Sequence, residues 1–181
     1  TANKTASAAD FLRARVSAGP YVLISRGIFL FDTSALTAGA TISAGVFSLC
    51  ANGTAVANAD SGNWDLVSVT PSTDTNIVVG DYSLLGTTFL ATSMALSSFT
   101  STDGTYNDLT LNASGISNIS KTANSKFGCR SSRDTSNTAA TGDNSARCYF
   151  SEQTGTSADP KIVITYTVAV ATARNMSNLL L

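Results

Sequence analysis

The chain has 181 residues, of which 43% are hydrophobic and only 13% are charged, and its net charge is −1. This length fits one domain with a substantial apolar core, and the hydrophobic content excludes intrinsic disorder. The small net charge and the scattered basic residues exclude nucleic-acid binding by phosphate neutralisation. No apolar run reaches the about 20 residues that cross a bilayer, so we expect no membrane span.

Short segments rich in β-branched and aromatic residues recur along the chain, separated by clusters of Gly, Asn, Asp and Ser. They predict about nine strands, at 11–16, 21–31, 43–51, 63–70, 87–99 (broken near 91–93), 105–111, 125–131, 145–152 and 161–168. Short helical turns are expected only within 76–85 and 113–120. Ser and Thr make up roughly a quarter of the chain and suit the exposed faces of sheets. The spacing predicts an all-β fold, an antiparallel β-sandwich of jelly-roll type.

Two of the expected strands have informative faces. The strand at 21–31 is apolar on both faces, which predicts a central position in its sheet. The strand at 161–168 places Ile162, Ile164, Tyr166 and Val168 on one face and mostly Lys or Thr on the other. It completes a predicted β-sandwich domain at 1–168, and 169–181 forms a C-terminal extension.

The C-terminal extension is apolar and ends in Leu179, Leu180 and Leu181. Left in water, these three leucines would forgo about 5 kcal/mol of burial free energy. Because the strand at 161–168 already closes the predicted sandwich, we expect the extension to dock on another protein subunit of a homo-oligomer or larger assembly. An extension that folds back on its own sandwich would favour sugar binding instead.

The residues that commonly carry catalysis are missing. Histidine is absent, which removes the commonest general base and the commonest metal ligand together. No Ser–His pair can form, and no G-x-S-x-G sequence occurs. Glu152 is the only glutamate, and most of the aspartates lie in apparent turns, where they bond backbone amides. We therefore expect a protein that is not an enzyme and has no cofactor.

A calcium site is an alternative for two pairs of aspartates, Asp103 with Asp108 and Asp60 with Asp65. The sequence lacks the D-x-D-x-D-G run that gathers six or seven oxygen ligands. Ordinary turns are the favoured interpretation of these aspartates.

A sugar-binding surface would draw on exposed aromatic rings, for which Trp64, Tyr82, Tyr106 and Tyr149 are the candidates. Trp64 begins a strand and shares a face with Leu66, so a core position is favoured for it.

Arg26 shares a strand face with Ile24 and Ile28, and a buried arginine needs an anionic partner. Glu152, on a neighbouring late strand, is the predicted partner in a buried ion pair, with Asp32 as the second choice. A position of Arg26 at the sheet margin, with its head in solvent, is the alternative.

Several stretches carry a family resemblance. SRGIFLFD at 25–32 is followed by GATISA at 39–44, and DPKIVITY at 159–166 stands near the end. These stretches resemble the DNRLRE-type β-sandwich, a domain of secreted, cell-surface and phage structural proteins. YNDLTLN at 106–112 and KFGCRSS at 126–132 are similar to its phage-associated versions. The resemblance implies a sandwich without catalytic residues, and some members of that family are described as carbohydrate-binding modules.

The sequence departs from this family at Cys50 and Cys129, where an ordinary apolar residue is expected. Cys129 and Cys148 fall in consecutive predicted strands, and a register that pairs Ser131 with Ala146 would bring them within disulfide reach. The same register sets Arg130 against Arg147, an unfavourable pair of like charges. A Cys129–Cys148 disulfide is therefore a candidate, with Cys50 left as a buried thiol.

These observations predict a structural subunit or decoration protein of a phage virion or a similar extracellular assembly. The low charge, the hydroxyl-rich surface and the apolar extension all favour it. The alternative is a carbohydrate-binding module of a secreted or tail-fibre protein, with glycans as partners.

Overall fold

The computed structural model describes residues 8–15 and 23–168, and it contains eleven strands and five short helices within them. The strands are β1 (Ala8–Arg15), β2 (Leu23–Asp32), β3 (Ala40–Cys50), β4 (Ala57–Asn58), β5 (Asn63–Val69), β6 (Leu85–Phe89), β7 (Met94–Ala95), β8 (Tyr106–Thr110), β9 (Asn124–Ser131), β10 (Asn144–Tyr149) and β11 (Lys161–Val168). The α-helices are α1 (Ala113–Asn118) and α2 (Ser132–Thr135), and the 3-10 helices are η1 (Ser34–Leu36), η2 (Val79–Leu84) and η3 (Leu96–Ser98).

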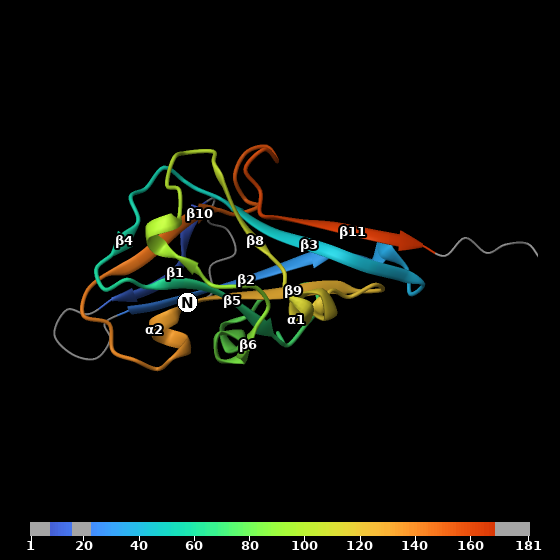
Figure 1. The fold of residues 1–181 in the computed structure, drawn as a ribbon, viewed down its shortest axis with the longest axis horizontal. Coiled ribbons are helices and arrows are strands. Elements are labelled where there is room, and N and C mark those ends of the chain that lie inside the picture. Colours follow the sequence, from blue (N-terminus) through green and yellow to red (C-terminus); the bar gives the residue numbers. More distant parts are fainter. Residues whose placement is uncertain (1–7, 16–22, 169–181) are drawn as a thin grey trace, which may run out of the picture.

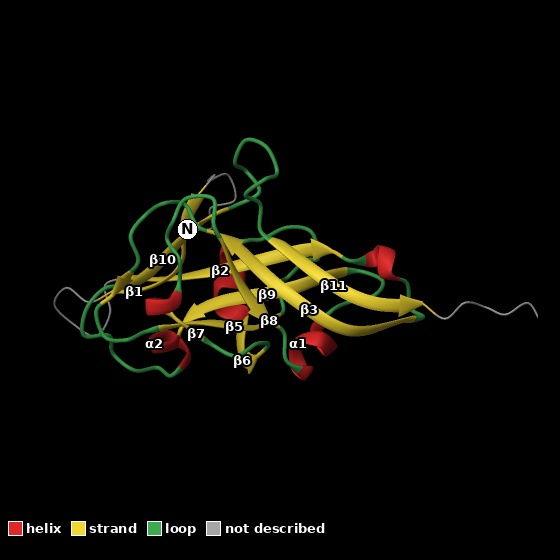
Figure 2. Cartoon of the chain, turned by 45° about the horizontal axis from the view of Figure 1, so that its top comes forward, coloured by secondary structure: helices red, strands yellow, loops and turns green. Residues whose placement is uncertain are grey.

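The strands form two antiparallel sheets that lie one over the other (Figure 1). The larger sheet has the order β4-β10-β1-β2-β9-β5-β6, and β7 also pairs with β5. The smaller sheet has the order β11-β3-β8. Figure 2 shows the broad ribbons of β3, β8 and β11 crossing over β2, β5 and β9. The predicted all-β antiparallel sandwich is confirmed.

An aromatic cluster fills the space between the two sheets. Phe47 of β3 is fully buried, and its ring contacts four rings of the larger sheet at centroid distances of 5.5 to 6.0 Å. These rings belong to Phe29, Phe31, Trp64 and Phe127. Each large aromatic side chain removes about 150–250 Å² of surface from water, so this cluster carries much of the free energy that holds the sheets together.

The strands number eleven where about nine were predicted, because the segment expected at 87–99 forms two strands, β6 and β7, and because β4, with only two residues, was not predicted. The segment expected at 87–99 breaks as predicted, since β6 ends at Phe89 and β7 begins at Met94. The helical turns expected within 76–85 and 113–120 are η2 and α1. The strand predicted to be central is β2, which lies between β1 and β9.

Helix α1 is fixed by its first turn. The Asn112 side chain caps it by accepting a hydrogen bond from the Gly115 backbone N–H at 2.9 Å. Gly115 is buried, and a Cβ atom at this position would clash with the carbonyl oxygen of Leu90. The glycine therefore lets the helix approach the chain that follows β6.

Two further predictions concern a membrane span and the C-terminal extension. None of the helices in residues 8–15 and 23–168 has the length and apolar character to cross a membrane. The predicted docking of Leu179, Leu180 and Leu181 concerns residues that lie outside the described ones, so it stays a prediction.

Candidate functional site

A charged cluster lies on the outer face of the larger sheet. Along β5, Trp64 and Leu66 face the aromatic core, so Asp65 and Val67 face outward. Arg130 of β9 lies directly opposite Asp65 in the sheet register. Helix α2 follows β9 immediately and adds Asp134 to this face.

Asp134 is the centre of the cluster. Its carboxylate accepts two hydrogen bonds from the Arg26 guanidinium, both at 2.7 Å, and two from Arg130, at 2.7 and 3.0 Å. The Asp134 side chain is only 4% exposed, and those of Arg26 and Arg130 are 15% and 9% exposed. One carboxylate therefore binds two guanidinium groups that come from neighbouring strands.

The remaining donors of both arginines bond backbone oxygens. Arg26 Nη1 donates to the Tyr82 carbonyl at 2.7 Å, and Arg130 Nη1 donates to the Gly86 carbonyl at 3.1 Å. The Arg26 guanidinium also lies 4.3 Å from the centre of the Tyr82 ring, a cation–π contact. These bonds tie η2 and the start of β6 to the sheet.

The ionisation of the cluster follows from its geometry. Burial alone would raise the pKa of Asp134, but the hydrogen bonds from Arg130 and Arg26 outweigh it and hold that pKa below its ordinary value. The hydrogen bond to Asp134 is the main cause that raises the pKa of Arg26. Asp134 and the two guanidinium groups together form a structural ion network.

Asp65 lies beside this network in a different environment. It is 2% exposed and accepts hydrogen bonds from the Thr135 and Ser93 hydroxyls. Burial raises the pKa of Asp65, and these two hydrogen bonds offset only part of the effect. The Asp65 carboxyl is thus a hydrogen-bond acceptor that is almost completely shielded from solvent.

An open pocket of about 360 Å³ includes Asp65 in its lining, and we call it the Asp65 pocket. Its walls include Asn63, Ser93, Arg133 and Thr135, and Phe89 stands at its side. Phe89 of β6 pairs with Val67 in the register, so it shares the outer face with Asp65, and its side chain is 43% exposed. The pocket therefore combines hydroxyls, an amide, a buried carboxylate and an exposed ring.

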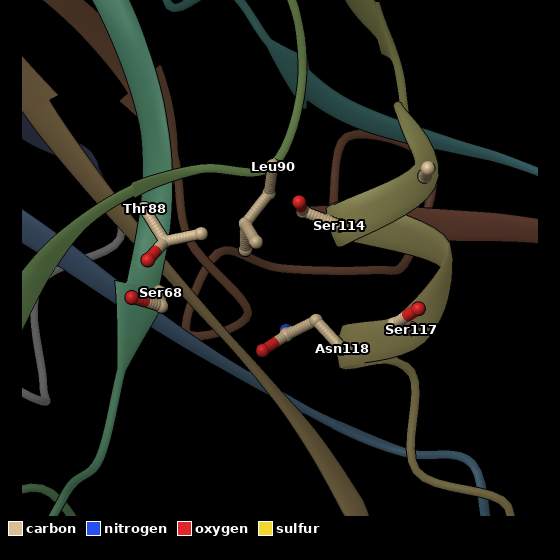
Figure 3. A pocket seen from close by; sticks show the side chains of 7 residues that line it. Ser68, Thr88, Leu90, Ser114, Ser117 and Asn118 are labelled. Atoms are coloured by element: carbon tan, nitrogen blue, oxygen red, sulfur yellow. The ribbon is translucent and has the colours of Figure 1, made fainter.

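A second opening, of about 420 Å³, lies between α1 and the strands β5 and β6. In Figure 3, Ser68 and Thr88 stand on one side of it, and Ser114 and Asn118 of α1 stand on the other. Its described lining carries hydroxyls, an amide and apolar groups and no charged side chain. It offers a ligand hydrogen bonds of ordinary strength only.

The predicted ion pair between Arg26 and Glu152 is wrong, and so is the second choice, Asp32. Arg26 is indeed an outward-facing residue of β2, but its carboxylate partner is Asp134. Glu152 lies exposed in the loop after β10, and Asp32 accepts hydrogen bonds from Ser34. Phe150, two residues before Glu152, stacks on Phe29 of β2 on the core side of the sheet, whereas Arg26 points to the outer face.

The predicted disulfide between Cys129 and Cys148 is also wrong. Cys129 lies in β9 between β2 and β5, whereas Cys148 lies in β10, which pairs with β1. Strands β1 and β2 therefore separate the two residues within the sheet. Cys50, Cys129 and Cys148 are all buried and reduced. The Trp64 indole N–H donates to Cys129 Sγ at 3.2 Å, so this thiol serves as a hydrogen-bond acceptor.

The four aromatic residues considered for sugar binding are all engaged within the protein. Trp64 is fully buried in the core, as favoured. Tyr106 bonds the carbonyls of Ser157 and Asp159 and lies under the Lys161 ammonium, at 3.6 Å. The Tyr149 hydroxyl donates to Asp103 at 2.8 Å, and Tyr82 packs on Arg26, so no row of free rings arises from these four.

Asp60, one of the aspartates weighed as calcium ligands, has other partners. Asp60 accepts from the Thr141 backbone N–H at 2.9 Å and pairs with Arg133 at 3.2 Å. In the described part of the chain, no three His, Cys, Asp or Glu side chains converge as they would around a metal ion.

The smaller sheet ends at an open strand, β11. Along its whole length β11 pairs with β3, and within residues 8–15 and 23–168 no other strand pairs with it. Ile162 and Ile164 pack toward the core, but Tyr166 and Val168, on the same face, are 43% and 49% exposed. Val163, on the opposite face, is 55% exposed. We call residues 162–168 the β11 edge.

Sequence reasoning missed Asp134 and Phe89, and it weighed Asp65 only as a calcium ligand. Arg130 and Asp134 are four positions apart, a spacing that joins side chains within a helix. Here, however, Arg130 belongs to a strand and Asp134 to the helix that follows it, so the spacing did not predict their ion pair. Phe89 meets Asp65 through the pairing of β6 with β5, which local patterns do not specify.

Comparison with family models, with curated proteins and with solved structures finds no match to this chain. The resemblance to the DNRLRE-type domain therefore stays a prediction.

Proposed function

We propose that this protein is a non-enzymatic structural subunit or decoration protein of a phage virion or a comparable extracellular assembly. The observation that carries the proposal is the β11 edge. Among the described residues no strand pairs with the outer side of β11, which presents a row of backbone N–H and C=O groups together with exposed Val163, Tyr166 and Val168. Such an edge is a template for a strand from a neighbouring subunit.

The β11 edge also lacks the features that monomeric proteins use against pairing. Residues 162–168 contain no charged residue and no proline. The one irregularity of its register places the extra residue in β3, so β11 itself continues without a bulge. The apolar extension at 169–181 follows this strand directly in the sequence. Together these features favour assembly over a free, monomeric binder.

The experiment is sedimentation velocity of the full chain over a range of protein concentrations. We expect species larger than a monomer, and we expect Tyr166→Lys to abolish them because it places a charge on the apolar face of the edge. Phe89→Lys is the matched control, since Phe89 is equally exposed and lies on an edge strand of the other sheet. A chain that stays monomeric at all concentrations contradicts the proposal.

A second candidate function is carbohydrate binding, and the Asp65 pocket favours it. Sugar hydroxyls both donate and accept hydrogen bonds, as do the hydroxyls of Ser93 and Thr135. Asp65 supplies a buried acceptor, and the exposed ring of Phe89 supplies an apolar surface for the C–H face of a sugar ring. Arg133 pairs with Asp60, so the pocket suits a neutral ligand better than a phosphate or other anion.

This candidate is tested by titrating the protein with glucose, galactose, mannose and N-acetylglucosamine while ¹H–¹⁵N spectra are recorded. Binding at the pocket would shift the amides around Asp65, and Phe89→Ala would weaken it by about tenfold or more. Tyr166→Ala, an equally exposed aromatic on the other sheet, should leave the affinity unchanged. Shifts that are absent, or that lie elsewhere, rule this pocket out as a sugar site.

A further inference from the structure

We infer that the strand received by the β11 edge is β11 of a second copy of this chain. The two strands run antiparallel across a two-fold axis at Thr165, so the two smaller sheets join into one continuous six-stranded sheet. The inference rests on the proposed function and names the partner and the register of the same edge.

The face pattern of β11 makes the strand self-complementary. Directly opposed residues of an antiparallel pair point to the same face of the sheet. With Thr165 on the axis, Ile164 opposes the partner's Tyr166, and Ile162 opposes the partner's Val168. The exposed side chains of Tyr166 and Val168 therefore each contact a half-buried isoleucine of the other copy. The apolar faces of the two strands lie on the same side of the joined sheet.

The charge pattern permits this contact. Because residues 162–168 carry no charge, two copies of the strand meet without like-charge repulsion along its length. Lys161, the one charged residue of β11, lies at its beginning with its ammonium over the Tyr106 ring. A closed two-fold contact is also the commonest symmetry among protein oligomers.

The neighbouring register fits less well. An axis at Ile164 would set Val168 against Pro160, which has no N–H group to donate to the ladder. It would also oppose Tyr166 to Ile162 and leave Val168 without an apolar partner. The axis at Thr165 pairs all seven residues of the β11 edge with residues of the same edge in the other copy.

The test is disulfide cross-linking of single-cysteine additions on one strand face, with oxidised glutathione as the oxidant. Thr165→Cys places the two new thiols directly opposite each other, and either type of antiparallel pair brings their Cα atoms within disulfide reach. Thr167→Cys is the matched control, because the two copies of position 167 lie about 14 Å apart in this register. Both threonines are exposed, and the three native cysteines are buried.

We expect covalent dimers from Thr165→Cys, none from Thr167→Cys, and mixed dimers when Val163→Cys and Thr167→Cys proteins are combined. Circular dichroism checks that each variant is folded. If the chain associates in sedimentation but Thr165→Cys stays uncross-linked, or Thr167→Cys cross-links equally well, this partner and register are wrong while the assembly proposal stands. If the chain does not associate at all, both the assembly proposal and the inferred β11 contact are wrong.

Discussion

Arg26 and Asp134 lie 108 positions apart in the sequence and are joined by two hydrogen bonds of 2.7 Å. Asp134 binds Arg130 at the same time, so a single carboxylate links β2, β9 and α2 on the outer face of the larger sheet. The pairing places η2 as well, because Arg26 also donates to the Tyr82 carbonyl. This contact anchors the polar side of a sheet whose other side is the aromatic core.

Asp134→Ala should lower the free energy of unfolding by about 3–5 kcal/mol, because it leaves the buried Arg130 guanidinium and the partly buried Arg26 guanidinium without the carboxylate that accepts their hydrogen bonds. Urea denaturation measures the change. The control is Asp74→Ala, which removes the partner of Lys126 at a side chain that is 58% exposed, and it should cost about 1 kcal/mol or less. Equal losses in the two variants would mean that the Asp134 network adds nothing beyond a surface ion pair.

Acid should weaken the same network. The pKa of Asp134 is lowered in the folded protein, so its contribution to stability is present above the pKa of the unfolded chain and is lost as the pH falls through the folded value. Stability of the unaltered protein should therefore drop below about pH 4, and the drop should be smaller in Asp134→Asn. Urea midpoints measured from pH 2 to 7 test this, and parallel curves for the two proteins would contradict it.

Asp65 should behave in the opposite way. Its pKa is raised by burial, so its contribution to stability is fully present below the unfolded pKa and is lost as the pH rises through the folded value. Asp65→Asn removes this titration and should gain stability relative to the unaltered protein between about pH 4 and pH 7. A gap between the two unfolding curves that does not vary with pH would contradict the raised pKa.

The three cysteines should behave as buried thiols. A reducing agent should leave the melting temperature unchanged, and alkylation after denaturation should label all three residues. The native protein should react slowly, because Cys50, Cys129 and Cys148 are buried and burial raises the pKa of the Cys129 thiol. A mass about 2 Da lower than that of the reduced chain would reveal a disulfide and contradict the three free thiols.

Glycine at position 115 should be required for the position of α1. Gly115→Ala forces the added methyl group against the Leu90 carbonyl and should cost about 1–3 kcal/mol. Gly39→Ala is the control, since a Cβ atom there meets nothing within 4 Å. Thermal unfolding of the two variants measures the difference, and an unperturbed Gly115→Ala protein would show that α1 packs less closely than described.

The features that depend on local pattern could be predicted from the sequence. The alternation at 161–168 identified the faces of β11, and the apolar character of 21–31 identified β2 as a central strand. The partner of Arg26 could not be predicted, because it depends on which strands are neighbours. Consecutive strands β9 and β10 are not neighbours here, which rules out the predicted disulfide, and Glu152 lies in an exposed loop rather than on a strand beside Arg26. The position of Phe89 beside Asp65 could not be predicted either, because it depends on the pairing of β6 with β5.

Hydrogen–deuterium exchange of the backbone amides of β11 tests most directly whether this edge is the assembly surface. The exchange rates are compared at low and high protein concentration, with β6, an edge strand of the larger sheet, as the internal control. We predict that the outward-facing amides among residues 162–168 become more protected as the concentration rises, because a neighbouring strand bonds them, while Leu85–Phe89 exchange at constant rates. Exchange in β11 that does not depend on concentration would contradict the account.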